Sequence, residues 1–174
     1  RPFMTEQAFF RSIAAGFDKQ EFLRLNETMT FPEYLERVKE NPMLACSAYQ
    51  RVFSMIVSKG IERFKRYNKT VKRYKFFSEN PYYPVFGLEE SIENLVNHVK
   101  GAAGYFGTEK RILLLHGPVG SSKSTICRAL KRGLEDFTAT ENGALYTFTW
   151  TNLPKDLDIK DTAPSPMHDD PIRL

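Results

Sequence analysis

The sequence contains few of the residues that cross-link small domains or bind metal ions. Only two cysteines, Cys46 and Cys127, and three histidines occur among the 174 residues. The cysteines show no C-x-x-C spacing and no histidine cluster accompanies them, so neither a disulfide framework nor a zinc site is indicated. We expect two reduced, buried thiols in a cytoplasmic protein.

Long hydrophobic runs are also absent from the sequence. No apolar run approaches the roughly 20 residues that cross a bilayer, and the first residues, RPFMTEQAFFRS, lack the continuous apolar core of a signal peptide. We therefore expect no membrane partner. The chain begins at an arginine, so we expect it to be trimmed or incomplete. With 41% hydrophobic and 26% charged residues, its composition is typical of a soluble globular protein.

The N-terminal third of the chain predicts helices. A weak apolar stripe runs through residues 3–25, and residues 30–33 (TFPE) form a helix start with a capping threonine, a proline in the first turn and a capping-box glutamate. Asn41-Pro42 ends that helix and begins another, whose apolar stripe continues to about Lys59. We expect these last two helices to form a helical hairpin.

A basic segment, residues 59–75, follows these helices. Its one acid is Glu62, and aromatic residues are interleaved with its cations, which are Lys59, Arg63, Lys65, Arg66, Lys69, Lys72, Arg73 and Lys75. This pattern suits a nucleic-acid surface, but the segment is short and contains no recognised binding module. We favour a solvated linker whose aromatic residues anchor it to a neighbouring domain, and nucleic-acid binding stays open.

The central part of the chain alternates between extended and helical patterns. Residues 78–87 (SENPYYPVFG) predict an extended connector, because prolines disfavour helix just before them. Residues 88–99 predict an amphipathic helix, and residues 144–150 (ALYTFTW) predict a strand rich in β-branched and aromatic residues. The segment from residue 152 to the last residue has little periodicity and predicts a loop.

Residues 111–129 (RILLLHGPVGSSKSTICRA) have the order expected of a phosphate-binding loop. The apolar run at residues 112–115 predicts a buried strand, a turn rich in small residues follows, and an amphipathic helix continues to about Phe137. The pattern G-x-x-x-x-G-K-[ST] is met at Gly117, Lys123 and Ser124, with Ser122 in place of the second glycine.

The loop predicts a site for a nucleoside triphosphate with Mg²⁺. Backbone N–H groups in such a turn form an anion-binding nest, and the helix adds its positive N-terminal end. Lys123 would reach the β- and γ-phosphates, and the Ser124 hydroxyl would bind Mg²⁺. If Ser122 needs a positive φ, it costs about 1–2 kcal/mol, which predicts weakened binding. The candidate residues are Gly117, Pro118, Val119, Gly120, Ser121, Ser122, Lys123, Ser124 and Thr125.

The residues that would complete an ATPase or kinase site are not visible in the sequence. A P-loop ATPase needs a second strand that ends in an acidic residue, and no such strand follows residues 144–150. The remaining aspartates lie in the proline-rich segment after residue 152, and no protein-kinase signature occurs. We therefore assign no catalytic residue and interpret the chain as the N-terminal part of a longer protein.

The order of these motifs resembles the PrkA family of bacterial serine protein kinases, which carry an AAA+-type nucleotide-binding core. The specific part is FGLEE at residues 86–90, GPVG-x-x-KS at residues 117–124 and PMHDDP at residues 166–171, in that order. The likeness covers roughly residues 31–174. Family members often have glutamates where this chain has Asp169 and Asp170.

The resemblance implies an α/β fold, in which a P-loop αβα sandwich follows a helical N-terminal segment. The expected domains are residues 1–77, helical with the basic linker, and residues 78–174, the first part of an AAA+-like ATP-binding domain. In AAA+ proteins the connector before the first core helix lies near the adenine, which points here to Val85 and Phe86. A simple domain connector is the alternative for this segment.

The function implied by the resemblance is ATP-dependent phosphorylation of protein serines, with ATP and Mg²⁺ bound at the loop. One alternative is an AAA+ ATPase that remodels or helps to degrade protein partners without a kinase step. The other is a nucleic-acid-binding module built on residues 59–75. We expect a protein substrate and allow for a homo-oligomer, and of these partners we expect nucleic acid least.

Overall fold

The computed structural model describes residues 26–66, 68–153 and 162–172. The helix predicted at residues 3–25 therefore lies outside the described residues. The chain divides into two units, Arg1–Glu36 and Arg37–Leu174, and each is considered by itself.

Helix α3 (Phe31–Glu40) begins at the predicted start signal. The backbone N–H and the hydroxyl of Thr30 both donate to Oε2 of Glu33, each at 2.7 Å. The glutamate therefore returns to the start of the helix as a capping box requires, and this part of the prediction is confirmed.

The helix predicted to continue to Lys59 is divided in two. Pro42–Ala45 form a short 3-10 helix (η1), and α4 spans Ala48–Ser58. Ser47 starts α4 with a complete capping box, in which its side chain accepts from Gln50 N at 3.3 Å and its own N–H donates to Gln50 Oε1 at 2.8 Å. Because these bonds satisfy backbone groups that a continuous helix would pair internally, the chain restarts the helix at this point.

The basic segment forms a β-hairpin, so the predicted linker was wrong. Strands β1 (Ile61–Arg66) and β2 (Lys69–Tyr74) pair antiparallel, from Ile61 opposite Tyr74 to Arg66 opposite Lys69. The turn contains Asn68 in the left-handed region (φ 61°), a conformation that asparagine tolerates better than most residues.

The hairpin packs on the helix that the sequence predicted near residues 88–99. That helix, α6, spans Glu89–Ala103, and β2 contacts it directly. A single helical turn, α5 (Lys75–Ser78), follows β2. The expected domain boundary at residue 77 stays a prediction, although β2 and α6 touch across it.

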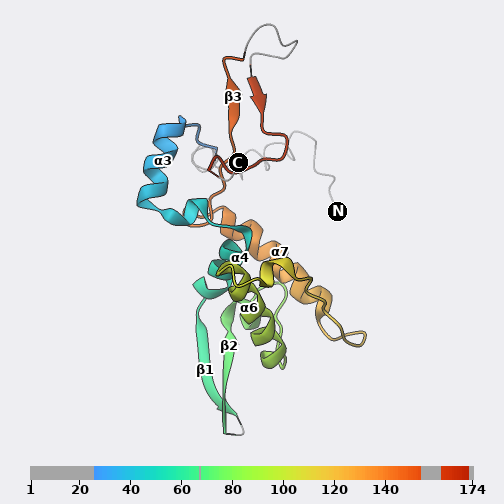
Figure 1. Cartoon of the computed structure of the whole chain (residues 1–174). Coiled ribbons are helices and arrows are strands. Elements are labelled where there is room, and N and C mark those ends of the chain that lie inside the picture. The colour runs from blue at the N-terminus through green and yellow to red at the C-terminus, as the bar shows by residue number, and fades with distance from the viewer. Residues whose placement is uncertain (1–25, 67, 154–161, 173–174) are drawn as a thin grey trace, which may run out of the picture. The chain divides into compact units, whose positions relative to one another are not determined.

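The core of the second unit lies where α4, α5 and α6 meet α7 (Lys123–Thr138), along which Ile126, Leu130, Leu134 and Phe137 face it. Figure 1 shows α4, α6 and α7 close together, and contacts join α4 to both of the others. Apolar side chains from each helix form one cluster, which includes Met55, Ile56, Phe76, Phe77, Val85, Ile92, Leu95, Val96 and Ile126. Burial of such side chains contributes about 1.5–3 kcal/mol each, and this cluster fixes the first turn of α7.

The strand predicted at residues 112–115 does not form, and that prediction was wrong. Residues 112–118 have no regular secondary structure, and Ile112 and Leu114 are 96% and 80% exposed. A strand is stabilised by hydrogen bonds to a neighbouring strand, and no strand in the described ranges pairs with this run.

The strand predicted at residues 144–150 is much shorter than expected. Strand β3 spans Thr149–Thr151 and pairs antiparallel with β4 (Thr162–Pro164), in a segment that the sequence predicted as loop. At the beginning of the predicted strand, the backbone binds a side chain instead of a neighbouring strand. The guanidinium of Arg51 donates to the carbonyl oxygens of Gly143 and Ala144 at 2.7 and 2.9 Å. Those oxygens point to α4 instead of a strand partner.

The described residues thus combine helices with two small antiparallel sheets, which is compatible with the predicted α/β class. The three-layer core stays a prediction. The two thiols, expected to be buried, are half-buried at Cys46 and exposed at Cys127. Among the helices that the structure describes, none has the length and apolar character needed to cross a membrane.

Candidate nucleotide-binding site

The predicted phosphate loop lies directly before α7, and the core holds the helix that carries it. Ile126 and Ala129, in the first two turns of α7, are buried, and Ile126 belongs to the core cluster. The start of the helix is therefore fixed by packing, while the loop before it remains largely exposed.

The loop backbone has a positive φ at two residues near the start of α7. Gly120 has a φ of 84°, and Ser122 lies in the left-handed region with φ 59° and ψ 14°. The sequence had predicted a cost at Ser122 if its φ were positive, and the structure meets that condition. A Cβ atom at Gly117 would lie 2.9 Å from Oγ of Ser121, so a larger residue there would displace that hydroxyl.

Lys123 is held at the centre of the loop. Its ammonium group donates to the carbonyl oxygen of Gly117 at 2.7 Å, to the carbonyl oxygen of Pro118, and to Oγ of Ser121 at 2.9 Å. The Ser121 hydroxyl in turn donates to the Pro118 carbonyl oxygen at 2.8 Å. These three acceptors of the ammonium are neutral, so the bonds position the positive charge without cancelling it.

The N-terminus of α7 adds backbone donors to that charge. The first backbone bond inside the helix runs from Ile126 N to Ser122 O at 2.9 Å. The N–H groups of Lys123, Ser124 and Thr125 precede it and have no acceptor within the helix. The first turn contains no acidic residue. Donors, helix end and lysine therefore fit a phosphate group.

The other predicted loop residues are placed differently with respect to solvent. Pro118, Val119 and Ser124 are exposed and Thr125 is partly buried. The exposed Ser124 hydroxyl, one residue into α7, is accessible to a phosphate-bound cation. Within the described ranges, no group of three or more His, Cys, Asp or Glu side chains could hold a metal ion.

The two residues predicted near the adenine differ in how far their side chains are buried. Val85 is 3% exposed and belongs to the core cluster, whereas Phe86 is 67% exposed. The backbone N–H of Val85 donates to the Phe77 carbonyl oxygen at 2.9 Å, which directs its side chain into the protein. Contact with a base therefore stays a prediction for the Phe86 ring, while the Val85 side chain is covered by protein.

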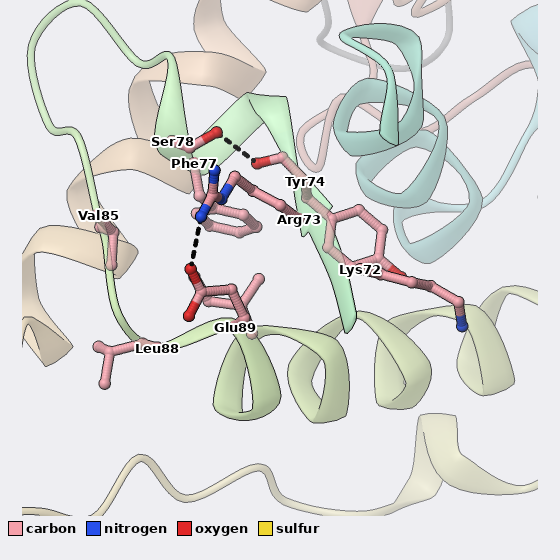
Figure 2. Close-up of a pocket in the computed structure, with 9 residues that line it drawn as sticks. Lys72, Arg73, Tyr74, Phe77, Ser78, Val85, Leu88 and Glu89 are labelled. Atoms are coloured by element: carbon pink, nitrogen blue, oxygen red, sulfur yellow. Dashed lines mark hydrogen bonds and ion pairs between the residues drawn. The ribbon is translucent and has the colours of Figure 1, made fainter. Parts of the chain in front are cut away.

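A small cavity lies beneath this connector and is not the nucleotide site. Figure 2 shows it between β2, α5, Val85 and the first turn of α6. Its volume is about 10 Å³, room for about one water molecule. Nε of Arg73 is buried and has no hydrogen-bond partner among the described residues, and Nη2 of the same arginine pairs with Glu89 at 3.2 Å.

Two ion pairs join the hairpin to α6. Lys72 pairs with Glu93 at 2.7 Å and Arg73 pairs with Glu89. The hydrogen bond to Glu93 raises the pKa of Lys72. The pKa of Glu89 is lowered, first by a hydrogen bond from its own backbone N–H and then by Arg73. These two basic residues therefore stabilise the fold, and their charged groups are engaged in ion pairs within it.

Arg51 is a positioning residue that the sequence analysis missed. It is buried, and besides the turn at residues 143–144 it binds the carbonyl oxygen of Leu44 at 3.2 Å. The sequence contains a sign of this role, because Arg51 lies on the apolar stripe of α4, one helical turn before Met55. A charged residue on such a stripe predicts a buried cation with several hydrogen-bond acceptors. It links η1, α4 and the chain that leaves α7.

Comparison with known proteins places these motifs in one family. The family model described as the PrkA AAA domain matches residues 29–174. The chain is 45% identical over 157 residues, or 90% of its length, to the ATP-dependent protease PrkA of Bacillus subtilis (strain 168), of which the match covers 21%. No solved structure matches the chain significantly.

Two further curated proteins are similar over shorter stretches. The serine/threonine kinase YeaG of Escherichia coli (strain K12) is 30% identical over 114 residues, which are 61% of this chain and 17% of that protein. An uncharacterized protein in the gldA 5' region of Geobacillus stearothermophilus is 43% identical over 90 residues, which are 51% of this chain and 84% of that protein. The chain thus spans about a fifth of the length of the two named enzymes.

Proposed function

Because the chain belongs to the PrkA AAA domain family, we propose that its phosphate loop, residues 117–125, binds Mg·ATP. The observation that carries the proposal is the Lys123 ammonium, whose hydrogen bonds within the described part of the chain all go to neutral oxygens of the loop. A bound phosphate would offer the same donors a negatively charged acceptor, and charge-assisted hydrogen bonds are roughly twice as strong as neutral ones.

The roles of the other loop residues follow from their placement. The N–H groups of Lys123, Ser124 and Thr125 would donate to phosphate oxygens, and the exposed Ser124 hydroxyl would bind Mg²⁺. Phe86, exposed on the connector, would stack on the base. When bound, ATP would supply a transferable phosphoryl group, and these residues would hold and orient it. The three-layer P-loop core is proposed on the same family basis.

Calorimetric titration of the chain with Mg·ATP tests the nucleotide site. We expect binding by the unmodified chain and its loss in Lys123→Ala. Lys131→Ala is the matched control, since Lys131 is an exposed lysine on the same helix. Equal binding by all three proteins would reject the assignment of Lys123, and no binding by the unmodified chain would reject the site.

For the use of the bound ATP we propose phosphoryl transfer to a protein serine, as the name of the YeaG relative suggests. The serine oxygen would lose its proton to solvent and form a bond to the γ-phosphorus, the bond from that phosphorus to the β–γ bridging oxygen would break, and ADP would leave. The whole natural protein that carries this chain should label serine from γ-labelled ATP. Serine labelling that persists in Lys123→Ala, or its absence from the unmodified protein, would contradict this assignment.

A second candidate is an ATPase that drives the degradation of protein partners, which the name of the PrkA relative favours. In that case the whole protein releases free phosphate, cleaves a protein partner only with ATP, and produces no phosphoserine. Both candidates use the same loop, so Lys123→Ala abolishes either activity. The chemical identity of the product distinguishes them. A cytoplasmic location and a homo-oligomer complete the proposal.

A further inference from the structure

The β1–β2 hairpin has two parts: a base whose cations pair with acidic residues, and an outer half that is basic. At the base, Lys72 and Arg73 pair with glutamates of α6. Lys75 lies 3.7 Å from Glu62 and 3.3 Å from Glu79. The acids near the hairpin are therefore matched by cations at its base.

The outer half, residues 63–71, has four cations and no acid. They are Arg63, Lys65, Arg66 and Lys69, and all four are exposed. In the strand register Arg66 lies directly opposite Lys69. Arg63, Lys65 and Lys69 therefore present positive charge to the solvent.

The cations occupy both faces of the ribbon. Because successive side chains of a strand point to opposite faces, Arg63 and Lys65 lie on one face, and Arg66 and its cross-strand neighbour Lys69 lie on the other. Apolar side chains are poorly available here. Phe64 is partly buried, with the Arg73 guanidinium 4.6 Å from its ring centre, and Val71 is partly buried.

This arrangement favours one kind of partner over another. A protein interface usually needs exposed apolar or aromatic anchors at its centre, and the described residues of the outer half do not offer them. The major groove of B-DNA admits a two-stranded β-ribbon, and its walls are lines of phosphates. A ribbon with cations on both faces matches a groove with phosphates on both sides, whereas the major groove of duplex RNA is too narrow for side chains to read.

We propose that the described residues of the outer half of the β1–β2 hairpin, 63–66 and 68–71, bind the phosphate backbone of duplex DNA by entering the major groove, without strong sequence preference. This inference is independent of the phosphate loop. It gives the basic segment a role that the two ATP-dependent functions leave unexplained. The proposed contacts to DNA are Arg63, Lys65 and Lys69, because Lys72 and Arg73 pair with α6.

The test is fluorescence anisotropy with a labelled 20-base-pair DNA duplex over a range of salt concentrations. The variant is R63Q/K65Q/K69Q. The matched control, K110Q/R128Q/K131Q, removes one arginine and two lysines from other exposed positions. Loss of three phosphate contacts should reduce the magnitude of the slope of log K against log[salt] by about 2.7, at about 0.9 per contact, and weaken binding at least tenfold at low salt. The control should retain the slope of the unmodified chain.

Folding of the hairpin variant is checked by thermal denaturation. Its Tm should equal that of the unmodified chain, because all three substituted side chains are exposed. Three results overturn the proposal. They are no DNA binding by the unmodified chain, equal loss in the control, and equal or tighter binding of duplex RNA, single-stranded DNA or poly-glutamate in place of duplex DNA.

Discussion

Replacing Ser122 with glycine should stabilise the protein, because Ser122 holds a left-handed conformation at φ 59°. An L-residue in this region costs about 1–2 kcal/mol. Glycine avoids that cost but loses about 0.5–1 kcal/mol more backbone entropy on folding. Ser122 makes no side-chain capping bond to α7, so no capping energy is lost with its hydroxyl. The net gain is therefore about 0.5–1 kcal/mol.

The gain can be measured in two ways. For a chain of this size we expect Ser122→Gly to raise Tm by about 1–4 °C in thermal denaturation. If Mg·ATP orders the loop further, part of the gain should appear as affinity, up to about fivefold by calorimetry. This affinity effect depends on the proposed nucleotide site, whereas the Tm effect does not.

Ser122→Ala separates the backbone from the side chain. Alanine removes the hydroxyl but retains the Cβ atom, so its Tm should equal that of the unmodified chain or lie below it. The reasoning is refuted if Ser122→Ala stabilises the protein as much as Ser122→Gly. It is equally refuted if Ser122→Gly lowers Tm.

Three further predictions concern the structure that positions the loop. Gly133→Ala should lower the free energy of unfolding by about 1–3 kcal/mol, because the new Cβ atom would lie 2.4 Å from Cε2 of Phe76. Denaturant unfolding measures this loss, and adding Phe76→Leu to the Gly133→Ala chain should recover part of it. Arg51→Met should cost about 1–3 kcal/mol by leaving buried carbonyl oxygens unpaired, and an unchanged urea midpoint would show that the three bonds do not stabilise the fold. The pKa of Glu89 lies below its ordinary value, so its stabilisation is present above about pH 4.3 and is lost as pH falls through the lower, folded pKa. Below about pH 5 the unmodified chain should therefore lose stability with falling pH more steeply than Glu89→Gln, and parallel curves would contradict this.

Local signals in the sequence predicted the helices well. The capping box at Thr30 and the amphipathic stripes of α6 and α7 place hydrogen-bond partners and apolar faces within a few residues of one another. These elements formed where expected because their stabilising contacts are local or need only one apolar face. The positive φ of Ser122 could also be anticipated, since the loop pattern asks for glycine at that position.

The strands could not be predicted in the same way, because strand stability depends on a partner that lies elsewhere in the chain. The apolar run at residues 112–115 has the composition of a strand but no paired neighbour among the described residues. Residues 59–75 suggested a linker because the segment is short and contains no recognised binding module. They form a hairpin with six cross-strand pairs, and Lys72 and Arg73 bind Glu93 and Glu89 on α6, which the order of residues alone does not show.

The central claim is that the loop at residues 117–125 is the nucleotide site, and amide hydrogen exchange with and without Mg·ATP tests it most directly. The account predicts slower exchange in peptides that cover residues 117–126, with unchanged exchange in β1 and β2. The same experiment on Lys123→Ala should show no change at the loop. Unchanged exchange in residues 117–126 under conditions where Mg·ATP binds, or protection confined to another segment, would contradict the claim.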